Sequence, residues 1–438
     1  MESDSLLAAL YRRRGGRTIR YDLETTRALL RELDLSPASP PSVHVAGTSG
    51  KGSTSAMAES ILRAAGLKTG LFTSPHLVRF EERIRAGGRE IPPAACRDAL
   101  ERVLAADARQ AARSGAREAT FFELATAAAW DWFTRCRVDV AINECGLGGR
   151  LDATNVLSPI VSVITPIALE HTEWLGDTLE KIAFEKGGII VPGVPVVLAP
   201  QLAEAEAVLL AIARERGSPV YRAKDAVPVE GLRPGKNGQR LRFALPGETP
   251  RETELPLLGP FQLENASAAL TAAALAMRAL GLRLKAETAA AGLACVRWPG
   301  RCQWLRRAPD LLLDVGHTPD EAEALAGYLR IVKQNRPIRL TAGLLSDKNP
   351  EGYFRALVPC IDEVRLLDLS RESERAMPLA RLARAAEAAG FHPLPAALPF
   401  GAAAAEAEAW ARKTGGIALF AGSLVVGGLA LRQRFSAP

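Results

Sequence analysis

The residues that point most directly to chemistry form a glycine-rich segment between an apolar run and a helical pattern: Gly47-Thr48-Ser49-Gly50-Lys51-Gly52-Ser53-Thr54. Glycines allow several backbone N–H groups to face one anion, and the N-terminus of the following helix adds its dipole. Lys51 would place a charge on terminal phosphates, and a hydroxyl of Ser53 or Thr54 would lie near the phosphates or a metal. Gly52 makes the segment depart from the strict G-x-x-x-x-G-K-[ST] pattern. A plain glycine-rich turn is the alternative, but the strand–turn–helix context favours nucleotide binding.

Three further residues follow predicted strands or end a helix. Glu144 comes directly after the apolar run Val138–Asn143, and an acid at the end of a parallel strand points toward the crevice where such sheets bind ligands. Its carboxylate would suit Mg²⁺, although a helix cap or a salt bridge explains it equally well. His171 follows the apolar run Ile160–Thr165, and a lone histidine is more often structural than a ligand. Lys186, in Phe-Glu-Lys-Gly-Gly, would by itself be an ordinary solvated lysine at a helix end.

Two other segments carry aromatic and basic side chains. Phe121 and Phe122 begin a helical pattern, and an aromatic pair would stack on a flat heterocycle or simply fill the core. His76 and Arg83 would suit a carboxylate, or form surface pairs with the neighbouring glutamates.

These segments resemble the folylpolyglutamate synthase/dihydrofolate synthase family of the Mur ligase superfamily. The loop fits G-T-x-G-K-G-[ST], and residues 143–190 fit E-x-G-L-G-G-R-L-D-A-T-N followed by D-H-T-x-x-L-G-D-T-L-x-x-I-A-x-E-K, with Glu170 in place of the Asp. Leu257–Ala266 fits L-x-G-x-x-Q-x-x-N-A, and Trp298–Arg301 contains the family's P-G-R. The resemblance extends from Thr18 to Gly428, and the N-terminal Arg20-Tyr21-Asp22-Leu23 is its poorest match.

The resemblance implies a set of site residues. Those that would bind ATP are Thr48, Ser49, Gly50, Lys51, Gly52, Ser53, Asn265, Arg301 and Asp314. Those that would hold Mg²⁺ are Ser74, Glu144 and His171. Those that would border the folate-type acid are His76, Arg83, Thr120, Phe121, Phe122, Glu123, Leu151, Asp152 and Ala153. The catalytic residues would be Lys51, His171 and Lys186, the last of them carbamylated.

The reaction implied by the resemblance is ATP-dependent amide synthesis. A carboxylate of dihydropteroate, or of the glutamate tail of a reduced folate, would attack the γ-phosphate of ATP, and L-glutamate would then displace phosphate from the acyl phosphate. Cations must offset the repulsion between the carboxylate and ATP. Closure of a hinge near Trp298 would bring Arg301 and Asp314 to the nucleotide.

The chain also departs from the family pattern. Ser49 stands where Asn is usual, and Asp314-Val315-Gly316-His317-Thr318-Pro319 replaces D-G-A-H-N-P. The alternatives are a Mur-type or diverged ligase that joins an amino acid to another carboxylate, and a P-loop nucleotide-binding protein without ligase activity. A Mur-type ligase should carry a UDP-binding domain ahead of its loop, and we expect none because the loop begins at Gly47.

Strand and helix patterns that alternate along the chain must position these residues. Predicted strands are Ser42–Ala46, Thr69–Thr73, Val138–Asn143, Ile160–Thr165 and Pro195–Leu198, and predicted helices are Ser53–Ala65, Ala94–Ala112, Phe121–Arg135 and Phe261–Ala279. The alternation predicts an α/β fold with a P-loop-type, doubly wound, mostly parallel sheet. Weak alternation with Gly and Pro over Pro228–Glu254 predicts an antiparallel insertion.

A second α/β pattern follows a break at Val296–Gly300. Its predicted strands are Leu311–Asp314, Ile338–Leu344, Glu363–Leu367 and Ile417–Ala421, with a helix over Ala396–Ala411. We therefore predict an ATP-binding ligase domain over residues 1–296, with the phosphate loop and the Mg²⁺ and pterin sites. A smaller C-terminal α/β domain of the glutamate-ligase type would follow over residues 297–438.

Bulk properties narrow the class of protein. The chain has 438 residues, 48% of them hydrophobic and 24% charged, which suits a globular protein of two domains. No apolar run reaches the length that spans a bilayer, and the net charge of +6 comes from basic residues that are spread among acids. The six cysteines contain no CxxC pair, so we expect reduced thiols. We expect a cytoplasmic monomer that acts on small molecules and binds neither nucleic acid nor membranes.

Overall fold

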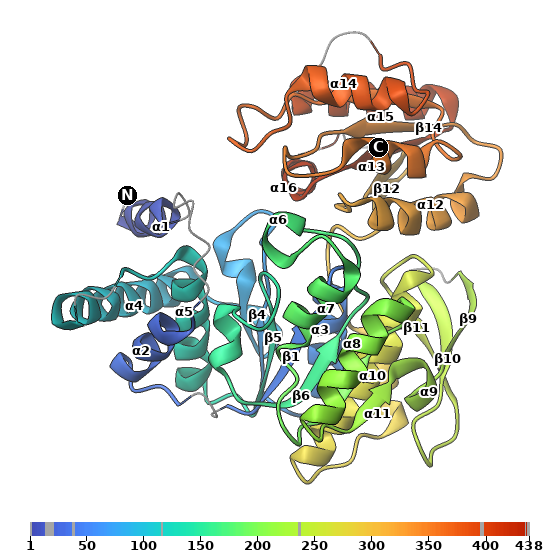
Figure 1. Cartoon of the computed structure of the whole chain (residues 1–438). Coiled ribbons are helices and arrows are strands. Elements are labelled where there is room, and N and C mark those ends of the chain that lie inside the picture. Colours follow the sequence, from blue (N-terminus) through green and yellow to red (C-terminus); the bar gives the residue numbers. More distant parts are fainter. Residues whose placement is uncertain are drawn as a thin grey trace. The chain divides into compact units, whose positions relative to one another are not determined.

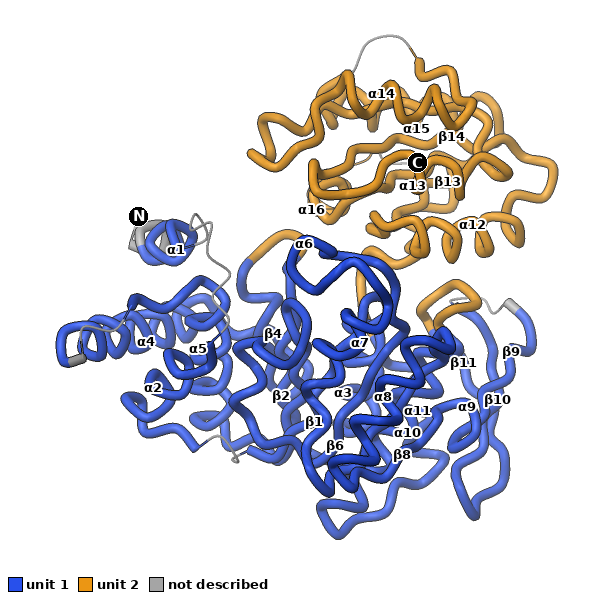
Figure 2. Tube along the Cα trace, viewed as in Figure 1, with its two compact units in different colours: residues 1–76, 80–255, 263–296 blue, residues 77–79, 256–262, 297–438 orange. Residues whose placement is uncertain are grey.

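The computed structural model describes residues 2–13, 22–36, 40–114, 117–234, 238–394, 398–433 and 435. The chain divides into two compact units (Figure 2). One comprises residues 1–76, 80–255 and 263–296, and the other comprises residues 77–79, 256–262 and 297–438. Within the described residues, no helix is both long enough and apolar enough to cross a membrane. All six cysteines lie in described segments and are free thiols.

The first unit is built on an eight-stranded sheet with the order β4-β3-β2-β5-β1-β6-β7-β8 (Figure 1). The six strands from β2 to β8 in this order are parallel, and at one edge β3 pairs antiparallel with β2 and β4 pairs antiparallel with β3. The strands are β1 Ser42–Ala46, β2 Thr69–Phe72, β3 Ile84–Ala86, β4 Arg89–Glu90, β5 Val140–Glu144, β6 Pro159–Ile164, β7 Val196–Leu198 and β8 Val220–Arg222. The central strands β1, β2 and β5 are buried along their whole length, as expected for a sheet covered on both faces.

Helices cover this sheet and bury apolar side chains in more than one core. Leu29, Leu100, Trp130 and Phe133 belong to the core that packs around α2, α4 and α5, whereas α7 and α8 enclose another core with β6 and β7. The helices are α1 Glu2–Arg12, α2 Glu24–Glu32, α3 Lys51–Ala64, α4 Pro93–Ser114, α5 Phe121–Cys136, α6 Thr172–Leu175, α7 Leu179–Gly187, α8 Ala203–Glu215, α9 Ala223–Ala226, α10 Phe261–Ala279 and α11 Ala286–Ala294, with short 3₁₀ helices η1 Phe80–Arg83 and η2 Ala153–Val156.

A separate three-stranded antiparallel sheet follows, with the order β11-β10-β9. Its strands are β9 Val229–Pro234, β10 Gln239–Phe243 and β11 Arg251–Leu255. The antiparallel insertion predicted over Pro228–Glu254 is therefore confirmed.

The second unit has a five-stranded sheet with the order β12-β13-β16-β14-β15, in which only β12 is antiparallel. Leu312, Leu340 and Leu419 face one core, and Leu311, Leu313 and Phe420 face another, so the alternation of side chains buries both faces. The elements are β12 Gln303–Arg307, β13 Asp310–Leu313, α12 Pro319–Lys333, β14 Ile338–Ala342, α13 Pro350–Leu357, β15 Glu363–Leu366, α14 Leu379–Ala388, α15 Phe400–Thr414, β16 Ile417–Ala421 and α16 Leu424–Arg432.

The predicted fold class is confirmed: a mostly parallel α/β domain is joined to a smaller α/β domain. Most predicted helices and strands differ from the observed ones by one or two residues at an end, and the helix predicted near residue 400 differs by more. The helix predicted over Ala396–Ala411 begins at Phe400 and continues to Thr414, because Pro399 precedes its first turn and Gly415 ends it in a left-handed conformation. Residues 395–397 lie outside the described part of the chain.

Candidate functional site

The glycine-rich loop joins the end of β1 to the start of α3. Gly47 has φ 144° and Gly50 has φ 85°, conformations that favour glycine. A Cβ on Gly47 would lie 1.9 Å from Thr165 Oγ1, and a Cβ on Gly50 would lie 2.4 Å from Asn265 Oδ1. Gly50 is also the N-cap of α3, and no side chain caps this helix. The loop thus brings backbone and helix N-terminus together as an anion site requires.

Two lysines converge on one carbonyl of this loop. Lys51 Nζ donates to Gly47 O at 3.0 Å and to Thr48 O at 2.9 Å, and Lys186 Nζ donates to the same Gly47 O at 2.6 Å. Lys186 is buried, and burial together with the charge of Lys51 lowers the pKa of its amine from 10.5 to about 7. Lys186 is therefore not the solvated helix-end lysine that its local sequence suggests.

Hydroxyl groups occupy the rest of the loop. Thr48 Oγ1 donates to Ala168 O at 3.2 Å and accepts from Ala168 N at 3.1 Å, which ties the loop to the segment after β6. Ser49 Oγ is buried and has no hydrogen-bond partner among the residues that the structure describes. Thr54 Oγ1 lies 3.5 Å from Asn265 Oδ1, so the α10 residue predicted to contact the nucleotide lies directly on the loop. Gly52 and Ser53 are buried in the first turn of α3.

Two of the predicted metal ligands, Ser74 and Glu144, lie at the ends of the neighbouring strands β2 and β5, and the third, His171, lies at the start of α6. Glu144 is the last residue of β5 and is 4% exposed, and its Oε2 accepts from the backbone N–H of Ser74 at 3.1 Å. His171 is the left-handed N-cap of α6, with Nε2 3.6 Å from Glu170 Oε1. Over the described residues, no group of three or more His, Cys, Asp and Glu side chains could hold a metal ion. The structure brings the backbone of Ser74 to the carboxylate of Glu144, and both side chains carry oxygen, the donor that Mg²⁺ prefers.

The residues predicted to border the acid form a cluster of rings and cations. Arg83 Nε lies 2.8 Å from His76 Nδ1, and its guanidinium stands 5.1 Å from the centroid of the Phe121 ring. Tyr11 of α1 stacks on Phe121 at 5.6 Å and its hydroxyl lies 3.4 Å from His76 Nε2. Nothing in our sequence interpretation singled out Tyr11, because its partners lie far along the chain.

Thr120 and Glu123 form the capping box of α5. Glu123 N donates to Thr120 Oγ1 at 3.4 Å and Thr120 N donates to Glu123 Oε2 at 2.7 Å, while Arg117 also binds this carboxylate. Phe122 packs against Phe72 with ring centroids 5.7 Å apart. Thr120 and Glu123 therefore cap the N-terminus of α5, and their T-x-x-E spacing is a capping-box pattern that the sequence could have revealed.

Asp152 organises the loop after β5. Its Oδ2 accepts from the backbone N–H groups of Gly146 at 2.9 Å and Leu147 at 2.8 Å, and its Oδ1 accepts from Thr154 N at 3.0 Å. Burial raises the pKa of its carboxyl, and these hydrogen bonds oppose that shift. Leu151 and Ala153 flank it, so all three residues predicted from one motif share this loop.

Arg301 and Asp314 lie in the second unit. Asp314 follows β13 and is buried, and its oxygens accept from the backbone N–H groups of Cys302 at 2.9 Å and Gly316 at 2.8 Å. Burial raises the pKa of Asp314, and the nearby charge of Arg301 lowers it. His317 Nδ1 lies 3.1 Å from Val315 O and 3.5 Å from Glu321 Oε2.

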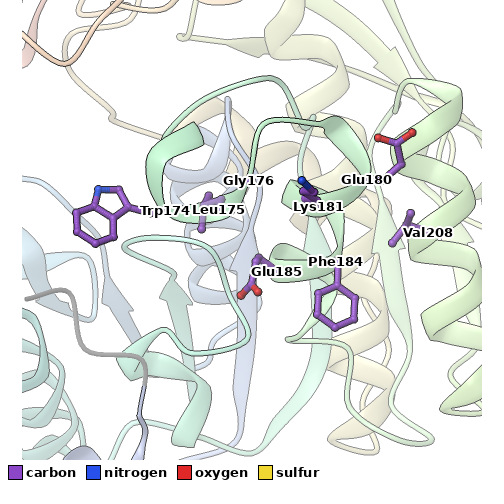
Figure 3. Close-up of a pocket in the computed structure, with 8 residues that line it drawn as sticks. All are labelled: Trp174, Leu175, Gly176, Glu180, Lys181, Phe184, Glu185 and Val208. Atoms are coloured by element: carbon purple, nitrogen blue, oxygen red, sulfur yellow. The ribbon is translucent and has the colours of Figure 1, made fainter.

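A surface pocket lies on α6, α7 and α8 and includes none of the predicted site residues (Figure 3). It is lined by Trp174, Leu175, Gly176, Glu180, Lys181, Phe184, Glu185 and Val208. Phe184 is 52% exposed and contacts Arg150 at 5.6 Å. The phosphate loop is therefore recognised by its backbone geometry and cations, and not by this pocket.

Solved structures share this architecture over nearly the whole chain. The chain superimposes with a TM-score of 0.88 on Mycobacterium tuberculosis folylpolyglutamate synthase complexed with ADP and AMPPCP, at 32% identity over 98% of both chains. The TM-score is 0.84 with Escherichia coli FolC in complex with DHPP and ADP, at 31% identity over 97% of this chain and 96% of that one.

Two families of domain match the sequence. Residues 45–273 match the Mur ligase middle domain, and residues 300–424 match the Mur ligase glutamate ligase domain. Together with the loop and its lysines, they define an ATP-dependent ligase of the Mur type. The chain is 35% identical to the folylpolyglutamate synthase of Lacticaseibacillus casei over 77% of this chain and 78% of the relative, and 35% identical to the dihydrofolate synthase/folylpolyglutamate synthase of E. coli K12 over 79% and 77%. The chain belongs to the folylpolyglutamate synthase/dihydrofolate synthase family, as the motifs predicted.

Proposed function

We propose that this protein uses ATP to join L-glutamate to dihydropteroate, to the glutamate tail of reduced folates, or to both. The observation that carries the proposal is the convergence of Lys51 and Lys186 on Gly47 O within the phosphate loop. Lys51 and the N-terminus of α3 would attract a polyphosphate, and the buried amine of Lys186 ties the same carbonyl to α7.

Lys51 and the N-terminus of α3 would bind the β- and γ-phosphates, and Asn265 would contact the nucleotide from α10. Mg²⁺ fits the oxygen donors of Glu144 and Ser74, with His171 as the third ligand implied by the family motif. When bound, this ion would neutralise phosphate charge. Arg301 and Asp314, in the second unit, remain predicted contacts of the nucleotide.

The chemistry is a phosphoryl transfer followed by an acyl transfer. A carboxylate oxygen of the acid attacks the γ-phosphorus, the bond to the β,γ-bridging oxygen breaks, and ADP leaves. The α-amine of glutamate then attacks the acyl carbon, loses a proton, and displaces inorganic phosphate as the amide forms. His76 and Arg83 would orient acidic groups of the substrate, and Phe121 would supply an aromatic surface to its flat ring.

Lys186 is proposed to carry a carbamate. Only a neutral amine attacks CO₂, and a pKa of about 7 leaves an appreciable neutral fraction near neutral pH. The N–C bond forms with loss of one proton, and the neutral amine becomes an anionic carbamate beside Lys51.

The test is ADP release by the purified protein with ATP, Mg²⁺ and glutamate, with dihydropteroate or tetrahydrofolate added in turn. We expect release to require one of these acids, and Lys51→Met to abolish it. Lys181→Met is the matched control, because Lys181 is an exposed lysine paired with Asp177. The proposal would be overturned if ADP release did not depend on either acid, or if Lys51→Met still released ADP. Dependence on another carboxylate would instead identify a Mur-type or diverged ligase.

We further propose that the protein is a cytoplasmic monomer. Sedimentation of the full chain at micromolar concentration, and fractionation of the cells that make it, test these two statements.

A further inference from the structure

A network of buried, hydrogen-bonded side chains connects strand β1 to the loop that carries Asp152. His44 Nε2 of β1 lies 2.7 Å from Thr154 Oγ1 in η2, and Thr154 Oγ1 donates to Asp152 Oδ1 at 2.5 Å. Cys145 Sγ lies 3.1 Å from the same His44 nitrogen. His44, Cys145, Thr154 and Asp152 are 5% exposed or less. The buried strand β1 therefore contributes the imidazole of His44 to a polar network with Thr154 and Cys145.

The donor and acceptor in each hydrogen bond of this network follow from the protons that its side chains carry. Thr154 has one hydroxyl proton, and the short bond to Asp152 uses it. Thr154 Oγ1 must then accept from His44 Nε2–H, which fixes the tautomer of His44, and Cys145 Sγ is a second acceptor for that proton. Burial lowers the pKa of His44 to about 3, so the ring stays neutral and keeps this arrangement.

Asp152, at one end of this hydrogen-bonded network, holds the loop of residues 146–154. Asp152 receives the backbone N–H groups of Gly146, Leu147 and Thr154, so one carboxylate closes residues 146–154 on themselves. Thr154 fixes the rotamer of that carboxylate, and His44 fixes the hydroxyl of Thr154. The phosphate loop is held by different contacts, those of Thr48 and Lys186.

We propose that His44 and Thr154 are positioning residues that set the acid-binding loop 146–154 through Asp152, without touching the substrate themselves. This inference rests on the proposed function, since it assigns the loop to the acid substrate. It predicts a separable effect: loss of the hydroxyl should weaken use of the acid and leave nucleotide binding unchanged.

The experiment compares Thr154→Val, which removes the hydroxyl at nearly constant shape, with Thr154→Ser, which keeps it. Ser162→Ala is the matched control, because Ser162 lies beside His44 in the sheet and makes one buried hydrogen bond, to Ile189 O at 2.7 Å. We expect Thr154→Val to raise KM for the pterin acid about tenfold, which corresponds to about 1.4 kcal/mol. The Kd of an ATP analogue should be unchanged, and Thr154→Ser should restore KM to within about twofold.

Amide hydrogen exchange provides a readout that needs no substrate. Gly146 and Leu147 should exchange faster in Thr154→Val and in His44→Leu, but not in Ser162→Ala. Equal KM changes for acid and nucleotide, the same KM increase in Ser162→Ala, or unchanged exchange at Gly146 and Leu147 would each overturn the inference. If the wild-type protein uses no pterin acid, the proposed function and the assignment of the loop to it fail together. The exchange data then still decide whether His44 and Thr154 hold the loop.

Discussion

Replacing Lys186 by methionine should change how the stability of the protein depends on pH. Methionine has a similar length and no charge, so it removes the titration and keeps most of the packing. Burial, and then the charge of Lys51, lower the pKa of Lys186 from 10.5 to about 7. At about 1.4 kcal/mol per pH unit, the folded protein disfavours the ammonium by several kcal/mol.

The sign of the effect follows from proton binding. Between about pH 7 and pH 10.5 the unfolded lysine holds a proton that the folded lysine has lost. The unfolded state then binds more protons, so the free energy of unfolding rises with pH over this range. Below about pH 7 both states are protonated and Lys186 contributes no slope.

The contribution of Lys186 to the free energy of unfolding is measured by denaturant unfolding of the wild type and of Lys186→Met. The buffers are free of CO₂ and range from about pH 6 to about pH 9. The difference between the two proteins should shift by about 2–3 kcal/mol in favour of the wild type as the pH rises from 7 to 9. Bicarbonate should stabilise the wild type further and leave Lys186→Met unchanged. A difference that stays constant across this range would show that Lys186 remains protonated, and it would refute the reasoning about both its burial and its carbamate.

Three other changes test separate parts of the structure. Gly50→Ala should weaken binding of an ATP analogue by roughly tenfold or more. A Cβ in this left-handed conformation costs about 1–2 kcal/mol, and it would also meet the side-chain amide of Asn265. Gly66→Ala is the control and should leave binding intact, because Gly66 has φ +88° but open space around it. Thr120→Ala should lower the free energy of unfolding by about 0.5–2 kcal/mol through loss of the α5 cap, and a decrease well outside that range would contradict a purely capping role. Phe354→Ala should destabilise the second unit by about 3–5 kcal/mol in calorimetry, and Val358→Ala, at an exposed position, should change little.

The elements that the sequence predicted best are those with strong periodicity and clear boundaries. Ser42–Ala46, Phe261–Ala279 and Ile417–Ala421 agree with the structure at both ends. Their apolar pattern is local, and so are the glycines or polar residues that end them. The predicted strand Val138–Asn143 begins two residues before β5 and stops one residue short of its end, because Glu144 is a polar residue that belongs to the last position of β5.

The site was harder to predict, because its decisive contacts join distant parts of the chain. The pattern around Lys186 indicates a helix end, and nothing nearby reveals that its amine meets Lys51 at Gly47 O. His44 is hidden in an apolar strand, and its role appears only when η2 places Thr154 against it. Family motifs marked most of these positions, but they gave no account of their charge states.

The make-up of the second unit has a consequence for how this protein can be divided. Residues 77–79 and 256–262 belong to that unit although they are far in sequence from residues 297–438. Leu77 packs against its apolar core, and a Cβ on Gly428 would lie 2.2 Å from Leu77 O. Leu258 and Phe261 pack against the other core of the same unit. A gene fragment that encoded residues 297–438 alone would lack these pieces, so the apolar side chains that they cover in both cores would be exposed to water.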